Sequence, residues 1–233
     1  MQENTIFINR YKEENVLPID EKEIWRYAGY RGNISDIDEE LKGVFEEVIA
    51  ELNGAFSYKV CYRRMNIEWN GCMPVLPFSS NSKKLARCLS GSNEIILFAA
   101  TVGLEIDRYI ARRQKISPLK ALFAQAFGAE RIESLCDTFC NDIRAEIETE
   151  KLFTTSRFSP GYGDLPLETQ TDIFKLLDCN RQIGVSLNDS LLMSPSKSVT
   201  AIMGLKCLGG EATSSHKCSA CNKTDCEFRK QEN

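Results

Sequence analysis

Residues 157–168 read RFSPGYGDLPLE, a stretch that neither a helix nor a central strand accommodates. Its two prolines remove backbone donors, and its two glycines favour turns. The stretch therefore predicts a rigid irregular loop. Glycines also let a ligand approach the backbone, and Arg157 offers a forked donor for a carboxylate or a phosphate. By composition alone, a proline-rich turn and a binding loop explain the stretch equally well.

Helical patterns flank this loop on both sides. Apolar residues recur at helical spacing over residues 119–151, with a change of phase at Gly128, and again over residues 167–179. The remaining pattern alternates helices and strands without a regular βαβ rhythm, which predicts an α+β fold with a largely antiparallel sheet and packed helices. The other predicted helices are 21–28, 37–52, 104–113 and a short one after Ser82; the predicted strands are 6–9, 56–68, 94–101, and 185–193 paired with 199–205.

Length and charge limit the class of protein. The chain has 233 residues, 42% of them hydrophobic, which is enough for one sizeable core. A net charge of -4 provides no overall basic field for nucleic acid. The first 15 residues lack the apolar segment of a signal peptide, and the longest apolar run, 95–100, is too short to cross a bilayer. We therefore expect a cytoplasmic protein with neither nucleic acid nor a membrane as partner.

Several catalytic motifs are missing from the sequence. Its single histidine, His216, lies near the C-terminus, which excludes a histidine-based triad, a histidine metal site in the core and a cobalamin-ligating D-x-H-x-x-G motif. The sequence has no phosphate-binding P-loop and no G-x-G-x-x-G. No pair of carboxylates stands out as catalytic. We therefore predict no catalytic residue, and expect function to come from binding and positioning or from cysteines.

The cysteines fall into two groups. Six are scattered along the chain and are expected to be reduced and buried: Cys61, Cys72, Cys88, Cys136, Cys140 and Cys179. The other four form a C-x10-C-x2-C-x4-C pattern that suits tetrahedral zinc or an iron–sulfur cluster, with His216 as a substitute ligand: Cys207, Cys218, Cys221 and Cys226. A C-x-x-C disulfide and free thiols are the alternatives. We therefore divide the chain into a domain at 1–206 and a cysteine-rich metal- or cluster-binding tail at 207–233.

Three segments together resemble the activation (reactivation) domain of cobalamin-dependent methionine synthase. RFSPGY at 157–162 is similar to the family's R-P-A-P-G-Y, and MSPSKSV at 193–199 is similar to its M-x-P-x-x-S-V. IESL at 132–135 more weakly resembles an A-E-A-F helix of the family. The resemblance covers residues 90–205 or so and implies the family's fold. The cysteine tail departs from it, and so does the loss of the family's distal tyrosine region.

The resemblance implies binding of S-adenosylmethionine. Carried over by residue, Arg157 holds the ligand's carboxylate, Glu133 holds its ammonium, Ser159 and Gly161 line it with backbone groups, and Tyr162 packs beside it. A zwitterionic amino-acid end needs one cation and one anion, and a sulfonium favours a polar or aromatic surround. Without the resemblance, Arg157 is interpreted as a surface salt-bridge residue, Glu133 as a solvated helix residue and Tyr162 as a residue that closes the loop. The family's N-terminal acidic contact has three candidates by position only: Asp20, Asp36 and Asp38.

The implied role is a stand-alone reactivation subunit. It would support reductive methylation of cob(II)alamin on a partner methionine synthase, as a component of that methyltransferase activity. The partner would carry the cobalamin, and a flavodoxin or ferredoxin would donate the electron. The alternative is a corrinoid-protein docking or electron-transfer adaptor that works through iron–sulfur or zinc at the tail cysteines. A third hypothesis is a structural interaction protein stabilised by zinc.

Overall fold

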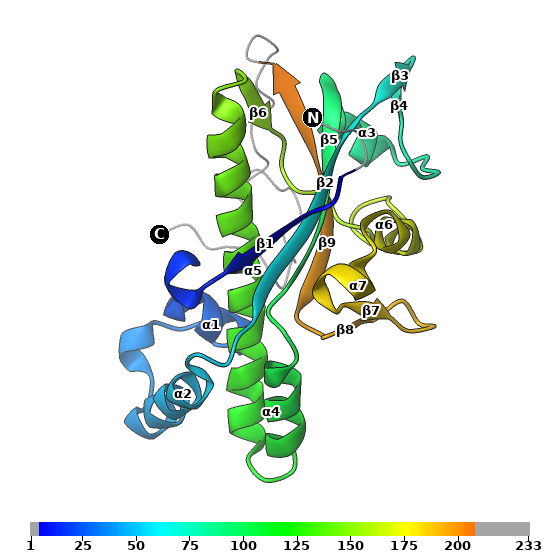
Figure 1. The fold of residues 1–233 in the computed structure, drawn as a ribbon. Coiled ribbons are helices and arrows are strands. Elements are labelled where there is room, and N and C mark those ends of the chain that lie inside the picture. The colour runs from blue at the N-terminus through cyan, green and yellow to red at the C-terminus, as the bar shows by residue number, and fades with distance from the viewer. Residues whose placement is uncertain (1–4, 208–233) are drawn as a thin grey trace.

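A five-stranded antiparallel sheet forms the centre of the molecule (Figure 1). The structure is a computed structural model that describes residues 5–207. The strand order is β1-β2-β5-β9-β6, so neighbouring strands come from distant parts of the chain. The strands span Phe7–Tyr11 (β1), Tyr58–Asn66 (β2), Ser92–Thr101 (β5), Leu152–Thr154 (β6) and Ser198–Cys207 (β9).

Both faces of this sheet are buried. Along β5, Ile96, Phe98 and Ala100 belong to one hydrophobic core. The intervening side chains, Ile95, Leu97 and Ala99, belong to a second core on the opposite face, as the two-residue period of a strand requires. The continuous apolar run at 94–101 is explained by this double burial, and the predicted α+β fold is confirmed.

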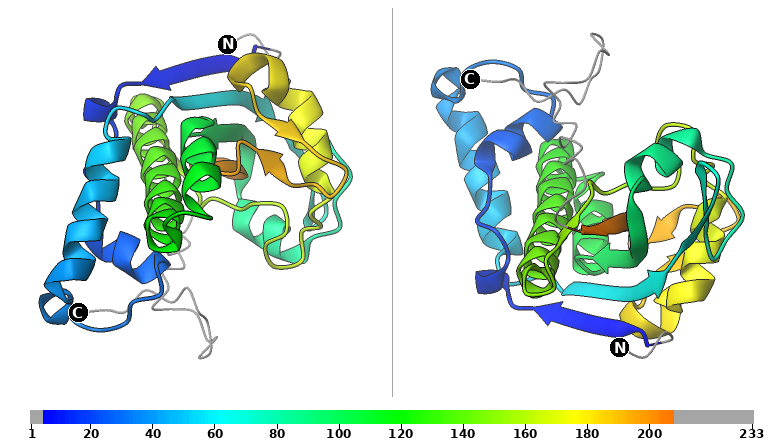
Figure 2. Two further views of the ribbon diagram at one scale, coloured as in Figure 1. Left: turned by 90° about the horizontal axis from the view of Figure 1, so that it is seen from below. Right: turned by 90° about the horizontal axis from the view of Figure 1, so that it is seen from above.

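Four helices cover the first face, and α5 is the longest of them (Figure 2). Its Phe139 ring packs 4.9 Å from that of Phe98 in the central strand. Ile106 and Lys197 pack against the helix at Gly128, where an added β-carbon would lie only 3.0 Å from each of them, closer than an ordinary van der Waals contact. Across residues 5–207, neither α5 nor any other helix is both long and apolar enough to cross a membrane. These helices are α1 (Glu21–Tyr27), α2 (Glu39–Leu52), α4 (Glu105–Arg113) and α5 (Pro118–Glu148).

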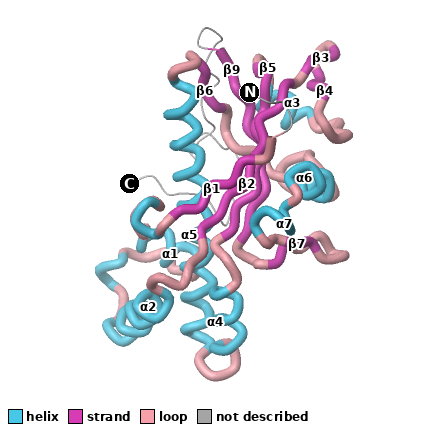
Figure 3. The backbone as a smooth tube through the Cα atoms, viewed as in Figure 1, coloured by secondary structure: helices cyan, strands magenta, loops and turns pink. Residues whose placement is uncertain are grey.

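Three shorter helices and the loop at 157–168 cover the second face. Two small hairpins accompany them, and the first continues from the end of β2 (Figure 3). Two 3-10 turns, η1 (Glu13–Asn15) and η2 (Ile34–Asp36), complete the N-terminal part. The helices are α3 (Lys83–Leu89), α6 (Thr169–Leu177) and α7 (Cys179–Ile183); the hairpins pair β3 (Glu68–Asn70) with β4 (Met73–Val75) and β7 (Ser186–Leu187) with β8 (Met193–Ser194).

The predicted pairing of strand 185–193 with strand 199–205 is wrong. Only β7 and β8 are extended within the first segment, and they pair with each other. The cause is Asn188, whose side-chain oxygen accepts hydrogen bonds from the backbone nitrogens of Ser190 and Leu192 and folds the segment back on itself. Strand β9 instead pairs with β5 and β6.

Candidate functional site

The path of the chain after β6 decides where Arg157 points. Thr155 donates its backbone N–H to the carbonyl of Gly204, and Phe158 exchanges two backbone hydrogen bonds of 2.9 Å with Ile202. The segment therefore follows the edge of β9, and successive side chains face opposite ways. Phe158 enters the second core, which leaves Arg157 directed towards α5.

Arg157 meets two carboxylates on α5. Its Nη2 lies 2.8 Å from Oδ1 of Asp137 and 3.2 Å from Oε2 of Glu133. The acids are four residues apart and so share one face of the helix. The Arg157 side chain is 24% exposed, whereas those of Glu133 and Asp137 are 48% and 52% exposed. The structure thus brings the predicted carboxylate-binding and ammonium-binding residues together, with a third group that sequence reasoning missed.

The surroundings favour a charged guanidinium. Burial alone lowers the pKa of Arg157, but the nearby carboxylates of Glu133 and Asp137 raise it, and the net direction is upward. Burial also raises the pKa of the Cys136 and Cys140 thiols, that of Cys140 to about 11. These buried thiols therefore stay protonated and uncharged next to the cluster.

The loop beyond Arg157 is a compact turn. Gly161 donates its N–H to the carbonyl of Leu165, and Tyr162 donates to the carbonyl of Ser159. Gly161 has a φ of +82°, a backbone conformation that glycine adopts without strain. Ser159 is partly exposed, and Tyr162 is 65% exposed, with its ring edge-on to Phe158 at 5.4 Å. All three predicted loop residues therefore lie at the surface or close to it.

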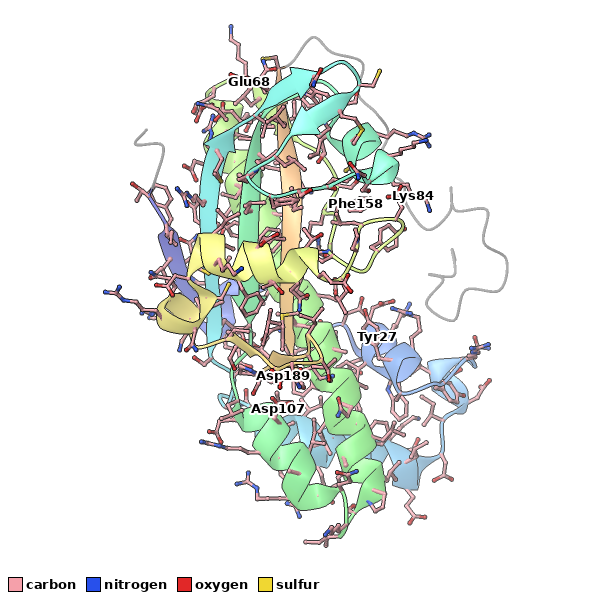
Figure 4. The ribbon with its side chains drawn as sticks, turned by 90° about the vertical axis from the view of Figure 1, so that its right-hand side faces the viewer. Tyr27, Glu68, Lys84, Asp107, Phe158 and Asp189 are labelled. Atoms are coloured by element: carbon pink, nitrogen blue, oxygen red, sulfur yellow. The ribbon has the colours of Figure 1, made fainter. Side chains whose placement is uncertain are left out.

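Asp164 ties the loop to α3. Its carboxylate accepts hydrogen bonds from the backbone nitrogens of Lys83 and Lys84 and from the Ser82 hydroxyl, the last of which contributes most to lowering the pKa of Asp164. Figure 4 shows Phe158 and Lys84 side by side at this contact, where both side chains lie close to the position that a β-carbon on Gly163 would take. The loop is thereby held by α3 on one side and by β9 on the other.

Helix α1 supplies a further group near the carboxylates. Burial, together with the nearby Glu133, raises the pKa of Tyr27 (labelled in Figure 4). The guanidinium of Arg26 lies over that ring, 4.4 Å from its centroid, and is itself paired with Glu23. Sequence reasoning missed Tyr27, because nothing local links residue 27 to residue 133. Asp137 had a signal: it follows Glu133 by one helical turn.

The three N-terminal candidates have local hydrogen bonds instead. The carboxylate of Asp20 accepts from the Glu23 N–H at the start of α1, and that of Asp38 accepts from the Glu40 N–H at the start of α2. Asp36 accepts from the hydroxyl of its neighbour Ser35. Two of the three acids are thus helix caps, and this chain's structure gives none of them a contact with Arg157.

The second matched segment, 193–199, forms the turn into β9. Asp107 on α4 accepts hydrogen bonds from both the backbone nitrogen and the hydroxyl of Ser196. Ser198 donates to the carbonyl of Pro195, and Lys197 packs against Gly128 of α5. This segment therefore fixes the start of β9 against α4 and α5, and its Met193 packs against the second core, to which Phe158 of the Arg157 loop also belongs.

The cysteine predictions are met in part. Cys61, Cys136, Cys140 and Cys179 are buried free thiols, whereas Cys72 is exposed and Cys88 is half-buried, so their predicted burial is wrong. Cys207 is an exposed free thiol at the end of β9. Within residues 5–207, no three acidic, cysteine or histidine side chains are grouped to hold a metal ion. The other proposed ligands, Cys218, Cys221, Cys226 and His216, lie outside the described residues.

Comparisons with known proteins place these features in a family. The family model described as "Vitamin B12 dependent methionine synthase, activation domain" matches residues 85–207, more than half of the chain. Among solved structures, 13 chains match. One is described as the MetH reactivation domain bound to AdoHcy; it is 16% identical, with a TM-score of 0.63, over 87% of this chain and 79% of that one. At this identity the likeness shows the fold. No curated protein matches.

Proposed function

The chain belongs to the family of vitamin B12 dependent methionine synthase activation domains, and on this premise we propose that it binds S-adenosylmethionine at the Arg157 loop. The observation that carries the proposal is the half-exposed cluster of one guanidinium and two carboxylates. Such a set suits a zwitterionic amino-acid end: Arg157 takes the ligand's carboxylate and Glu133 takes its ammonium. A solved structure of similar fold, the MetH reactivation domain bound to AdoHcy, supports an S-adenosyl ligand for this site.

The loop provides the rest of the proposed contacts. Ser159 and Gly161 offer backbone groups. The positive φ of position 161 favours glycine, which has no side chain to block a ligand. The exposed ring of Tyr162, held against Phe158, offers an aromatic face to the sulfonium.

In the proposed reaction, the chain is a cytoplasmic, stand-alone reactivation subunit. It supports reductive methylation of cob(II)alamin that a partner methionine synthase carries, with one electron from a flavodoxin- or ferredoxin-type donor. Bound S-adenosylmethionine supplies the methyl group. The chain's own residues bind and orient that ligand, and because methyl transfer moves no proton, none of them needs to act as an acid or a base.

Titration calorimetry with S-adenosylmethionine tests the site. We expect binding in the micromolar range, and Arg157→Ala should weaken it about 10- to 100-fold, because hydrogen bonds to charged groups contribute about 1.5–3 kcal/mol. Arg144→Ala is the matched control, since this exposed arginine of α5 bonds to Asn141 and Thr154 instead. Equal affinity of wild type and Arg157→Ala would rule out the Arg157 loop as the binding site. Absence of binding by wild type would rule out the proposed function.

The tail cysteines are the basis of the alternative function. We propose that Cys207, Cys218, Cys221 and Cys226 bind zinc or an iron–sulfur cluster, as their spacing suggests. Anaerobic purification of the full chain, followed by iron, sulfide and zinc analysis, distinguishes the hypotheses. A reducible cluster without S-adenosylmethionine binding favours a docking or electron-transfer adaptor, and zinc without ligand binding favours a structural protein.

A further inference from the structure

Strand β1 is an open edge of the sheet, and it is the outermost strand in both views of Figure 2. It pairs with β2 along its whole length without a bulge. Within residues 5–207, no other segment forms a backbone hydrogen bond with its outer edge. Alternate residues of β1 therefore direct their N–H and C=O groups away from the sheet, where another strand can pair with them.

The opposite edge of the sheet is better covered. Strand β6 has only three residues, and the chain beyond it continues along β9 through the hydrogen bonds of Thr155 and Phe158. Short edge strands and covering loops are two ways in which proteins prevent unwanted pairing. Of the two edges, only β1 presents five consecutive extended residues to another chain.

One face of β1 carries an apolar and a positively charged side chain. Ile8 lies opposite Cys61, which belongs to the second core, so Ile8 and Arg10 both face that side of the sheet. Ile8 is 36% exposed although it is aliphatic. Arg10 is exposed and lies directly opposite Lys59 of β2. An incoming strand would thus meet Arg10 and Ile8 two residues apart on one face.

The pairing of Arg10 with Lys59 is unfavourable within the chain itself. Like charges directly opposite each other on neighbouring strands destabilise the pair. Among the residues that the structure describes, no acid forms an ion pair with either cation, and the next cation along, Lys12, is paired with Glu14 in a largely exposed contact. The chain as a whole has a net charge of -4, so this edge has a local charge opposite to that of the whole. An acidic partner would relieve the repulsion.

We propose that β1 is a docking edge for an extended, acidic segment of a partner protein, which adds to the sheet as a further strand. Main-chain hydrogen bonds provide the affinity of such an added strand, and the side chains opposite Arg10 and Ile8 provide its selectivity. All neighbouring strands of this sheet are antiparallel, so we assign that direction to the segment. An acid then lies opposite Arg10, and an aliphatic side chain follows two residues later, opposite Ile8.

A second copy of the chain fits this edge less well. Antiparallel pairing of two β1 strands about Asn9 would place Arg10 of each copy opposite Ile8 of the other. Arg10 and Lys59 of both copies would then gather at one interface without an acid. A cation on an edge strand ordinarily prevents such self-pairing. If that is its only role here, β1 will not distinguish an acidic segment from a basic one.

The probe is a fluorescent peptide with blocked ends and the sequence Glu-Thr-Glu-Thr-Val-Thr-Val. Paired antiparallel, its second glutamate faces Arg10 and its first valine faces Ile8. Fluorescence anisotropy with the full chain should give a Kd below about 1 mM. Replacing both glutamates by lysines should weaken binding at least about tenfold, because attraction is exchanged for repulsion.

Methylation of the peptide nitrogens tests the added strand directly. Alternate residues of an edge-paired peptide direct their N–H groups to β1, and the others direct them to solvent. Methylating one alternate set should therefore abolish binding, whereas methylating the other set should preserve it. Equal tolerance of both sets would mean that the peptide does not pair with the backbone of β1, and the proposal would be wrong.

Charge reversal on the protein completes the test. Arg10→Glu should weaken the acidic peptide about tenfold and favour the lysine peptide, whereas Arg112→Glu, at an exposed position near the end of α4, is the matched control and should leave both affinities unchanged. Arg10→Glu should unfold at no lower temperature than wild type, because it places an opposite charge against Lys59. It should also keep the affinity for S-adenosylmethionine, since the Arg157 loop follows β9 and not β1.

Three results would overturn the proposal. Wild type that does not bind the acidic peptide has no docking edge for such a segment. Equal binding of the acidic and lysine peptides would remove the role of Arg10 in selectivity. A wild-type dimer in sedimentation equilibrium that the acidic peptide dissociates would show that a second copy occupies β1. None of these results bears on binding at the Arg157 loop.

Discussion

Two guanidinium groups contact acids of helix α5 that lie within about two turns of each other, and the two groups differ in how deeply they are buried. Arg131 bonds to Glu130, and both side chains are almost completely buried. Arg131 also donates to the carbonyls of Leu17 and Pro18, and Glu130 accepts from the backbone nitrogen of Asp20. These partners, Leu17, Pro18 and Asp20, belong to the N-terminal segment, so the buried pair holds that segment against α5.

Arg157 shows the contrasting arrangement. Its two acids are about half exposed, and it contacts both of them through a single nitrogen, Nη2. Solvent can therefore replace either contact at little cost, and so can a ligand. Charge pairing alone therefore does not identify a binding site. A buried pair whose hydrogen bonds are all made within the chain stabilises the fold, whereas a half-exposed pair can exchange one of its partners for a ligand.

Paired substitutions of the two arginines would test this distinction most strongly. Arg131→Met leaves the buried Glu130 carboxylate without its cation, which should lower the free energy of unfolding by about 3–5 kcal/mol. Arg157→Met should lower it by less than about 1 kcal/mol, because exposed ion pairs contribute little. Urea unfolding at neutral pH measures both. Equal losses would mean that Arg157 is a structural residue, as Arg131 is.

The sequence predicted the open cluster better than the enclosed one. The composition of residues 157–168 and the family's motif both point to Arg157, because they are local signals. Glu130 and Arg131 look like ordinary adjacent charges on a helix, since their burial depends on Leu17 and Pro18, more than 100 positions away. Long-range packing of this kind leaves no local pattern.

The same limit applies to the strands and to Asp137. Burial on both faces made β5 predictable from its apolar run, whereas the turn at Asn188 overrode an alternating pattern that favoured a longer strand. The helical period places Asp137 on the face of Glu133. Its contact with Arg157 depends on how the loop follows β9, which only the structure reveals.

A smaller effect is expected from the backbone of the loop. Gly161 and Gly91 have nearly equal positive φ angles, +82° and +80°, so each substitution by alanine should cost about 1–2 kcal/mol in unfolding free energy. At Gly161 the new β-carbon also meets Leu167 at 3.3 Å, while at Gly91 it meets nothing within 4 Å. If ligand binding must restore the strained loop, Gly161→Ala should weaken S-adenosylmethionine binding about tenfold, the factor that 1.4 kcal/mol represents.

Gly91→Ala serves as the control for that measurement, because it carries the same backbone strain away from the site. Its affinity for S-adenosylmethionine should match that of wild type while its stability falls in parallel with Gly161→Ala. Weaker binding in both variants would mean that general destabilisation causes the loss of affinity. Unchanged binding in both would mean that the loop backbone does not contribute to the ligand site.

The smallest expected effect comes from a third cluster, which reverses the charges of the Arg157 cluster. Glu51 accepts hydrogen bonds of 2.7 Å from Lys120, Tyr109 and Arg113, and these donors, Lys120 first, lower its pKa from 4.5 to about 2. A lowered folded-state pKa gives stability that is present above pH 4.5 and is lost as the pH falls towards 2. Because the side chain is 33% exposed, solvent screening should keep the contribution below about 1 kcal/mol.

Unfolding curves for wild type and Glu51→Gln at several pH values between 5 and 2.5 measure this contribution. The difference between the two proteins should be largest at pH 5 and should narrow steadily as the pH falls, because Glu51 takes up a proton in the unfolded state while it stays ionised in the folded state. Parallel curves would mean that Glu51 is not held by its three donors. A contribution of Glu51 well above 1 kcal/mol would show that a partly exposed cluster can stabilise the fold as much as a buried one. Exposure would then no longer distinguish the proposed binding cluster at Arg157 from the structural pair of Glu130 and Arg131.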